Sequence, residues 1–327
     1  MYEGNTKLLF ARETEPFDHS LNLKALREGK TESERVPYVH AMLTDELDTY
    51  QTIPLWDGTA PFWKDAPGQR EPRIAFFPAA GGRKSGCVLV APGGAYNCVV
   101  AQIEGYPIIR ELVRAGISAA LLSYRVKPFS QYISLIDAQR ALRLLRARAG
   151  ELNIHKDRIA IHGSSAGGHL SCMAAVHHDP GDPLAADAVD RESCRPDAAI
   201  ISYGVFSQSA FPRTGAFIQY TDECKTLEFQ GGGLVSSLGD PDIAHKFFFS
   251  AEKHVTPQTP PFFIWQTCDM DDPRQAYLLG KALADAGVRC EMHIFPFGPH
   301  GLGIATSDKH IGLWVRLAIE FLDYYGF

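Results

Sequence analysis

One stretch of the chain decides its fold: Ile159-Ala160-Ile161-His162-Gly163-Ser164-Ser165-Ala166-Gly167-Gly168-His169. An apolar, β-branched run leads into a Gly-x-Ser-x-Gly pattern, and small helix-forming residues follow at once. This order predicts a strand that ends in a sharp turn, with Ser165 at the turn and a helix behind it. Glycine on both sides of Ser165 leaves room for the turn, because larger side chains would collide with the neighbouring strand and helix. The pattern arises by chance in roughly one chain in ten of this length, so its meaning depends on what lies around it.

The bulk composition is that of a globular protein with a large core. The chain has 327 residues, of which 45% are hydrophobic and 21% charged, and its formal net charge is −6. No basic patch is visible, which argues against a nucleic-acid partner. No apolar run is long enough to span a bilayer, and the N-terminus lacks the order of a secretory signal. The seven cysteines have no paired spacing, so we expect reduced thiols and a cytoplasmic protein without a membrane partner.

From residue 86 onward, short apolar runs alternate with longer helical ones. This alternation predicts an α/β fold in which helices cover both faces of a mostly parallel sheet. The expected strands are residues 87–90, 117–122, 158–161, 198–201, 262–265 and 292–295, and the expected helices are 106–115, 133–149, 167–176, 275–286 and 311–325.

Two parts of the chain depart from this rhythm. Residues 1–70 are polar and rich in proline, with a short helix expected near 21–27 and an aromatic cluster at Trp56, Phe62 and Trp63. We interpret them as an N-terminal extension packed on a main domain at 71–327, with aromatic side chains that would suit contact between copies in a homo-oligomer. Residues 204–256 have no clean period, and long insertions of this kind are often functional lids.

Two further polar residues follow predicted strands at positions suited to acyl transfer. A serine becomes nucleophilic when a histidine, itself oriented by a carboxylate, takes its proton. Asp269 follows the strand at 262–265, and His300 follows the strand at 292–295. Both therefore fall at the carboxyl ends of sheet strands, where open α/β folds place their active sites. Asp271 is the alternative to Asp269 as the acid.

A glycine-rich turn follows the first expected strand: Ala91-Pro92-Gly93-Gly94-Ala95-Tyr96. Acyl transfer requires N–H donors for the oxyanion that forms when the serine attacks. The backbone N–H of Gly94 or Ala95, together with that of Ala166 after the serine, would supply an oxyanion hole.

These motifs together resemble the α/β-hydrolase fold esterases, and within them the acetyl-xylan-esterase-like or endo-xylanase-associated branch. The resemblance covers about residues 50–327 and rests on the oxyanion turn with the following Glu104-Gly105, the Ser165 motif, the Asp269 loop, and Gly298-Pro299-His300-Gly301. It implies removal of acetyl groups from xylan fragments or related sugar esters, with no cofactor and no metal. The chain departs from the branch at Ala95, where a third glycine is usual, and at the acidic residues after Asp269.

Several alternatives stay open at this level. Tyr96 and Glu104 would either line the substrate pocket or anchor the oxyanion turn. His169, early in the helix after Ser165, is better explained as a buried packing residue than as a catalytic one. The same Ser-Asp-His set would also suit an amide-cleaving enzyme, such as a formamidase or peptidase. A catalytically silent binding protein on the same fold is the third hypothesis.

Overall fold

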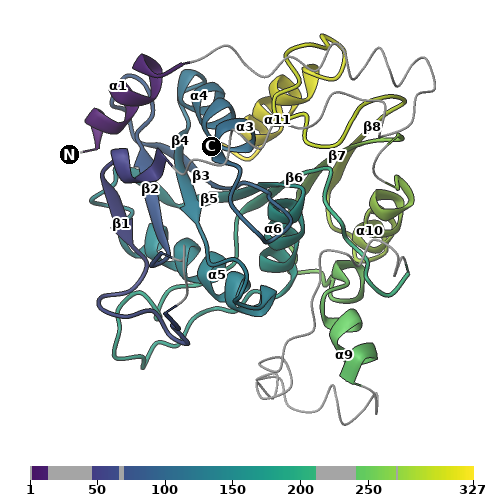
Figure 1. The fold of residues 1–327 in the computed structure, drawn as a ribbon, viewed down its shortest axis with the longest axis horizontal. Coiled ribbons are helices and arrows are strands. Elements are labelled where there is room, and N and C mark those ends of the chain that lie inside the picture. Colours follow the sequence, from purple (N-terminus) through teal and green to yellow (C-terminus); the bar gives the residue numbers. More distant parts are fainter. Residues whose placement is uncertain (1, 14–45, 66–69, 211–240, 270–271) are drawn as a thin grey trace.

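The computed structural model describes residues 2–13, 46–65, 70–210, 241–269 and 272–327. Within them, eight strands form one sheet in the order β1-β2-β4-β3-β5-β6-β7-β8 (Figure 1). The pairs from β4 to β8 are parallel, and β1–β2 and β2–β4 are antiparallel. The strands are β1 (Thr52–Pro54), β2 (Arg73–Phe77), β3 (Ser85–Ala91), β4 (Ser118–Ser123), β5 (Ile154–Ser164), β6 (Ala198–Ser202), β7 (Phe262–Thr267) and β8 (Cys290–Phe295). The predicted mostly parallel α/β sheet is confirmed.

Helices cover both faces of this sheet, as expected (Figure 1). One hydrophobic core lies under α5, α6 and α10, and the other under α1, α4 and α11. Successive residues of β7 alternate between them: Ile264 belongs to the first core and Trp265 to the second. Burial on both faces explains why the central strands are almost continuously apolar. The helices are α1 (Glu3–Ala11), α3 (Ala101–Glu104), α4 (Tyr106–Arg114), α5 (Gln131–Ala147), α6 (Ala166–Val176), α9 (Pro241–Phe248), α10 (Arg274–Asp285) and α11 (Leu313–Tyr324), with short 3-10 helices at Glu46–Thr49 and Ala251–Lys253.

The described parts of residues 1–70 are built into the main fold. Strand β1 extends the sheet, and α1 lies against β2 (Figure 1). The Asn5 amide donates to the carbonyls of Gln51 and Phe76, at 2.8 and 3.0 Å. Arg110 in α4 donates to the carbonyl of Leu9, near the end of α1. The sequence interpretation did not include α1, β1 or β2, and its expected helix at 21–27 lies outside the described residues.

The described ends of the 204–256 insertion meet each other. Residues 206–209 lie beside the segment that follows α9, with the N–H of Ala251 donating to the carbonyl of Phe206 at 2.8 Å. The Ser250 hydroxyl accepts from the N–H groups of Gln208 and Ser209, both at 2.9 Å. The insertion therefore leaves and rejoins the domain at one place, close to the carboxyl end of β6.

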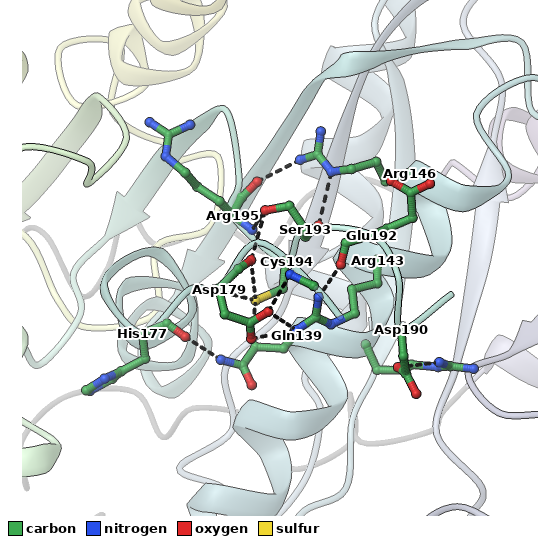
Figure 2. Close-up of polar contacts among 12 residues, drawn as sticks. Gln139, Arg143, Arg146, His177, Asp179, Asp190, Glu192, Ser193, Cys194 and Arg195 are labelled. Atoms are coloured by element: carbon green, nitrogen blue, oxygen red, sulfur yellow. Dashed lines mark hydrogen bonds and ion pairs between the residues drawn. The ribbon is translucent and has the colours of Figure 1, made fainter. Parts of the chain in front are cut away.

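A long excursion between α6 and β6 is fixed to α5 by arginines three residues apart (Figure 2). The Arg143 guanidinium donates to both carboxylate oxygens of Asp179 at 2.5 Å. Arg146 donates to the carbonyls of Ser193 and Arg195, at 3.1 and 2.6 Å. These charge-assisted bonds hold a loop of irregular backbone without adding to either hydrophobic core.

Candidate active site

Ser165 lies at the predicted sharp turn between β5 and α6. Its backbone has φ 55° and ψ −121°, a conformation that L-residues rarely adopt and that costs about 1–3 kcal/mol. The flanking glycines are required by contact. A Cβ at Gly163 would lie 2.0 Å from the carbonyl oxygen of Gly167, and a Cβ at Gly167 would lie 1.9 Å from that of Ala91. The elbow therefore tolerates no side chain at either position.

His300 reaches the serine from the loop after β8. The Ser165 hydroxyl lies 2.6 Å from Nε2 of His300, although the two residues are 135 positions apart in the sequence. Ser165 is 8% exposed, so the serine is largely buried but still in contact with solvent. The backbone N–H of Ser165 donates to the carbonyl of Ser202 at 3.0 Å, which ties the elbow to the end of β6. The contact between the Ser165 hydroxyl and Nε2 of His300 is the one that a serine nucleophile needs with its general base.

Asp269 lies two residues after β7 and is exposed. Its Oδ2 accepts a hydrogen bond of 2.8 Å from the backbone N–H of Gly298, two residues before His300. The carboxylate thus holds the loop that carries the histidine. Asp271, the alternative acid, lies outside the described residues.

The glycine-rich turn after β3 lies against the nucleophile. A Cβ at Gly93 would come within 2.7 Å of the Ser165 Cβ, so the backbone passes close beside the serine. Gly94, Ala95 and Tyr96 follow with positive φ values of 132°, 53° and 56°. In the part of the chain that the structure describes, the N–H groups of Gly94, Ala95 and Ala166 have no hydrogen-bond partner. They are available to an oxyanion formed at Ser165.

Tyr96 and Glu104 are both buried, at 3% exposed each. The Tyr96 hydroxyl lies 2.8 Å from Nδ1 of His169, and the Glu104 Oε2 accepts from the N–H of Gly93 at 2.7 Å. These contacts favour the anchoring role over a place in the substrate pocket, the two roles that the sequence left open.

His169 is a buried packing residue, as the sequence indicated. Its Nε2 lies 3.3 Å from the carbonyl of Phe249, which can only accept, so Nε2 carries the proton and Nδ1 accepts from Tyr96. Burial lowers the pKa of His169 to about 4, so the ring is neutral at pH 7.

Comparison with known proteins is consistent with this geometry. The BD-FAE family model matches residues 75–283. The chain belongs to the BD-FAE family. It is 34% identical over 239 residues to endo-1,4-beta-xylanase B of Butyrivibrio fibrisolvens, which covers 70% of this chain and 34% of that protein. It is 25% identical over 255 residues to an acetylxylan esterase of Xylanibacter ruminicola, covering 74% and 47% of the two chains. The chain thus spans less than half the length of these curated relatives.

Solved structures share the BD-FAE chain's fold. The acetyl ester-xyloside bifunctional hydrolase from Caldicellulosiruptor lactoaceticus is 34% identical, with a TM-score of 0.75 over 85% of this chain and 97% of that one. An esterase of Thermogutta terrifontis, 23% identical, gives a TM-score of 0.60 over 80% and 92%. The expected α/β-hydrolase fold and the resemblance to xylan-associated esterases are confirmed.

Tyr203 is a site residue of this BD-FAE chain that was not predicted from the sequence. It follows β6 with φ 38°, is 1% exposed, and its ring makes a T-shaped contact with the His300 ring, with the two centroids 5.3 Å apart. A signal was present in the sequence, because Tyr203 lies just after the predicted strand at 198–201, and the carboxyl ends of parallel strands meet at the end of the sheet where Ser165 lies.

The described residues contain no group of three or more His, Cys, Asp or Glu side chains placed to hold a metal ion. Among the helices that the structure describes, none is both long and apolar enough to cross a membrane.

Proposed function

We propose that this BD-FAE family member hydrolyses carboxylic esters through a covalent acyl intermediate on Ser165. The observation that carries the proposal is the 2.6 Å contact between the Ser165 hydroxyl and Nε2 of His300, at a serine held with φ 55°. Esterases among the relatives support the same reaction class.

In the proposed first step, the Ser165 oxygen attacks the ester carbonyl while Nε2 of His300 accepts the hydroxyl proton. The developing oxyanion accepts hydrogen bonds from the N–H of Gly94 or Ala95 and from that of Ala166. His300 then gives its proton to the leaving alcohol. In the second step, His300 takes a proton from water as the water oxygen attacks the acyl carbon. His300 then gives this proton to the Ser165 oxygen as its bond to the acyl carbon breaks, which restores the serine and releases the carboxylic acid.

We propose Asp269 as the acid that orients His300, with Asp271 as the alternative. The position of Asp269 after β7 and its bond to the loop of His300 support this assignment. A carboxylate near Nδ1 would fix the tautomer in which Nε2 accepts the serine proton.

We propose an acetylated sugar, such as an acetylated xylo-oligosaccharide, as the substrate. The support is the names of the relatives: an acetylxylan esterase, a xylanase, and an acetyl ester-xyloside bifunctional hydrolase. The catalytic domain in this proposal is 71–327, with residues 1–70 as an extension; the contact of α1 with β2 supports packing of the extension on the domain, and β1 joins the sheet of the domain itself.

A hydrolysis panel tests the substrate class. We expect acetylated xylo-oligosaccharides to have the highest kcat/KM, aryl esters to be cleaved less well as the acyl chain lengthens, and formyl amides to be cleaved poorly. Preference for a formyl amide would instead support the amide-cleaving alternative. Absence of turnover on the whole panel, together with no labelling by a fluorophosphonate, would support a silent binding protein.

A further inference from the structure

The Tyr203 hydroxyl joins two segments that flank the nucleophile. It donates to Oε1 of Glu104 at 3.1 Å and accepts from the backbone N–H of Gly303 at 3.0 Å. Both bonds are buried, and the hydroxyl acts once as donor and once as acceptor, as its chemistry requires. Gly303 lies three residues after His300, so this bond fixes the loop that carries the general base.

Glu104 continues the connection to the oxyanion turn. Its second carboxylate oxygen accepts from the N–H of Gly93 at 2.7 Å. Hydrogen bonds therefore run without interruption from Gly93, through Glu104 and Tyr203, to Gly303. The turn that offers the oxyanion donors and the loop that carries the base are held to one buried carboxylate.

The His300 loop and α3 are in close contact. A Cβ at Gly303 would lie 2.6 Å from the carbonyl oxygen of Ile103, the residue before Glu104. The Gly303 carbonyl in turn accepts from the indole N–H of Trp314 at 3.1 Å. The His300 loop is thus in close contact with α3 and is also bound by a side chain of α11.

Tyr203 and its neighbour also contact the nucleophile elbow and the base. The Ser202 carbonyl accepts from the N–H of Ser165, and the rings of Tyr203 and His300 are in T-shaped contact. The strained backbone of Tyr203, with φ 38°, points to a conformation imposed by these combined contacts.

We propose that Glu104 and Tyr203 are positioning residues that fix the oxyanion turn and His300 relative to each other around Ser165. Neither side chain needs to touch the ester, and each acts through backbone groups that it binds. The proposal rests on the proposed function, because it assumes that Ser165 and His300 react. The reaction rate is sensitive to these relative positions, since a displacement of a catalytic group by about 1 Å lowers the rate up to about 100-fold.

Two conservative variants remove the connection without removing bulk. Tyr203→Phe keeps the ring against His300 but deletes the hydroxyl between Glu104 and Gly303. Glu104→Gln keeps the shape but presents one acceptor and one donor, so it cannot accept from both Gly93 and Tyr203. If either variant does not fold, the other still decides.

The decisive measurement is kcat per active site, with sites counted by fluorophosphonate titration so that unfolded enzyme is not counted. We expect kcat on an aryl acetate to fall roughly 10- to 100-fold in each variant with KM within about threefold. The double variant should lose little more than the worse single one, because both break the same connection. A role confined to stability would lower the number of titrated sites and leave kcat per site unchanged.

Ser118→Ala is the matched control. Its buried hydroxyl accepts from the N–H of Ala79 at 3.0 Å at the start of β4, the end of the sheet opposite to the site. We expect it to lower thermal stability and to keep kcat per site. Wild-type kcat per site in both Tyr203→Phe and Glu104→Gln would overturn the inference. Full activity in Ser165→Ala would overturn the proposed function instead, so the two failures are distinguishable.

Discussion

The Ser165 hydroxyl and Nε2 of His300 lie 2.6 Å apart, held by strands that are not neighbours in the sheet. Ser165 follows β5 and His300 follows β8, with β6 and β7 between them. The loop of His300 must therefore cross back over the carboxyl ends of two strands, and its contacts with Asp269, Tyr203 and Trp314 hold it there.

The oxyanion turn should not tolerate a methyl group at Gly93. A Cβ there would lie 2.5 Å from Oε2 of Glu104 and 2.7 Å from the Ser165 Cβ, so Gly93→Ala must push the turn away from the nucleophile. We expect kcat on an aryl acetate to fall by about 10²–10³, the usual cost of a lost oxyanion donor. Gly150→Ala is the control, because a Cβ there meets nothing within 4 Å. Equal kcat values in the two variants would contradict the described turn.

The acid of the triad is decided by two matched variants. Asp269→Asn should lower kcat by about 10⁴, the effect of replacing a triad aspartate by its amide. Asp271→Asn, two positions later in the sequence, should retain most of the activity. The opposite pattern would assign the role to Asp271.

The fold should lose stability in mild acid because the buried His162 and His169 and the half-buried His177 are neutral in the folded chain. Burial lowers the pKa of His162 to about 3 and that of His169 and His177 to about 4. The unfolded chain takes up protons near pH 6.5, and the folded chain does not until lower pH. The free energy of unfolding is therefore highest above about pH 6.5 and falls as the pH drops from there toward 4, by up to about 1.4 kcal/mol per pH unit per histidine.

Urea unfolding at pH 7.5, 6.5, 5.5 and 4.5 measures this slope. His177→Gln should flatten it, since the amide can still donate to the carbonyl of Phe248 that Nε2 of His177 contacts at 2.9 Å. His310→Gln, at an exposed position, should leave the slope as in the wild type. An unchanged slope in His177→Gln would show that this histidine does not stay neutral in the folded protein at these pH values.

The ion pair between Arg125 and Asp137 should be the costliest to break. Both side chains are 0% exposed, and the guanidinium also donates to the carbonyl of Pro61 and stacks on Trp56. Asp137→Asn leaves a buried cation without its counter-ion, which costs about 3–5 kcal/mol of unfolding free energy. Asp285→Asn, in an exposed pair with Lys281, should cost less than about 1 kcal/mol. Similar urea midpoints for the two variants would contradict this difference.

The sequence predicted the parallel part of the sheet well, because burial on both faces leaves long apolar runs such as residues 262–267. The sequence did not predict α1, β1 or β2. Strand β1 has three residues, and β2 pairs antiparallel at one side of the sheet, so neither fits into a β-α alternation.

The proximity of Ser165, Asp269 and His300 could be predicted because each lies in the segment after a strand, and the carboxyl ends of parallel strands lie at one end of the sheet. The connection between Glu104 and Tyr203 could not be predicted. These residues are 99 positions apart, and their contact depends on how closely α3 approaches the end of β6. No local sequence pattern predicts the distance between α3 and the end of β6. A buried glutamate after a glycine-rich turn gives the same sequence signal whether it binds substrate or backbone.

The most direct test of the account is the turnover of an activated acetyl ester by Ser165→Ala compared with Ser164→Ala. Ser164 is the adjacent serine, and its buried hydroxyl has no hydrogen-bond partner in the structure. We predict that Ser165→Ala loses at least about 10⁴-fold in kcat, while Ser164→Ala stays within about threefold of the wild type. Retention of most of the activity in folded Ser165→Ala would contradict the mechanism.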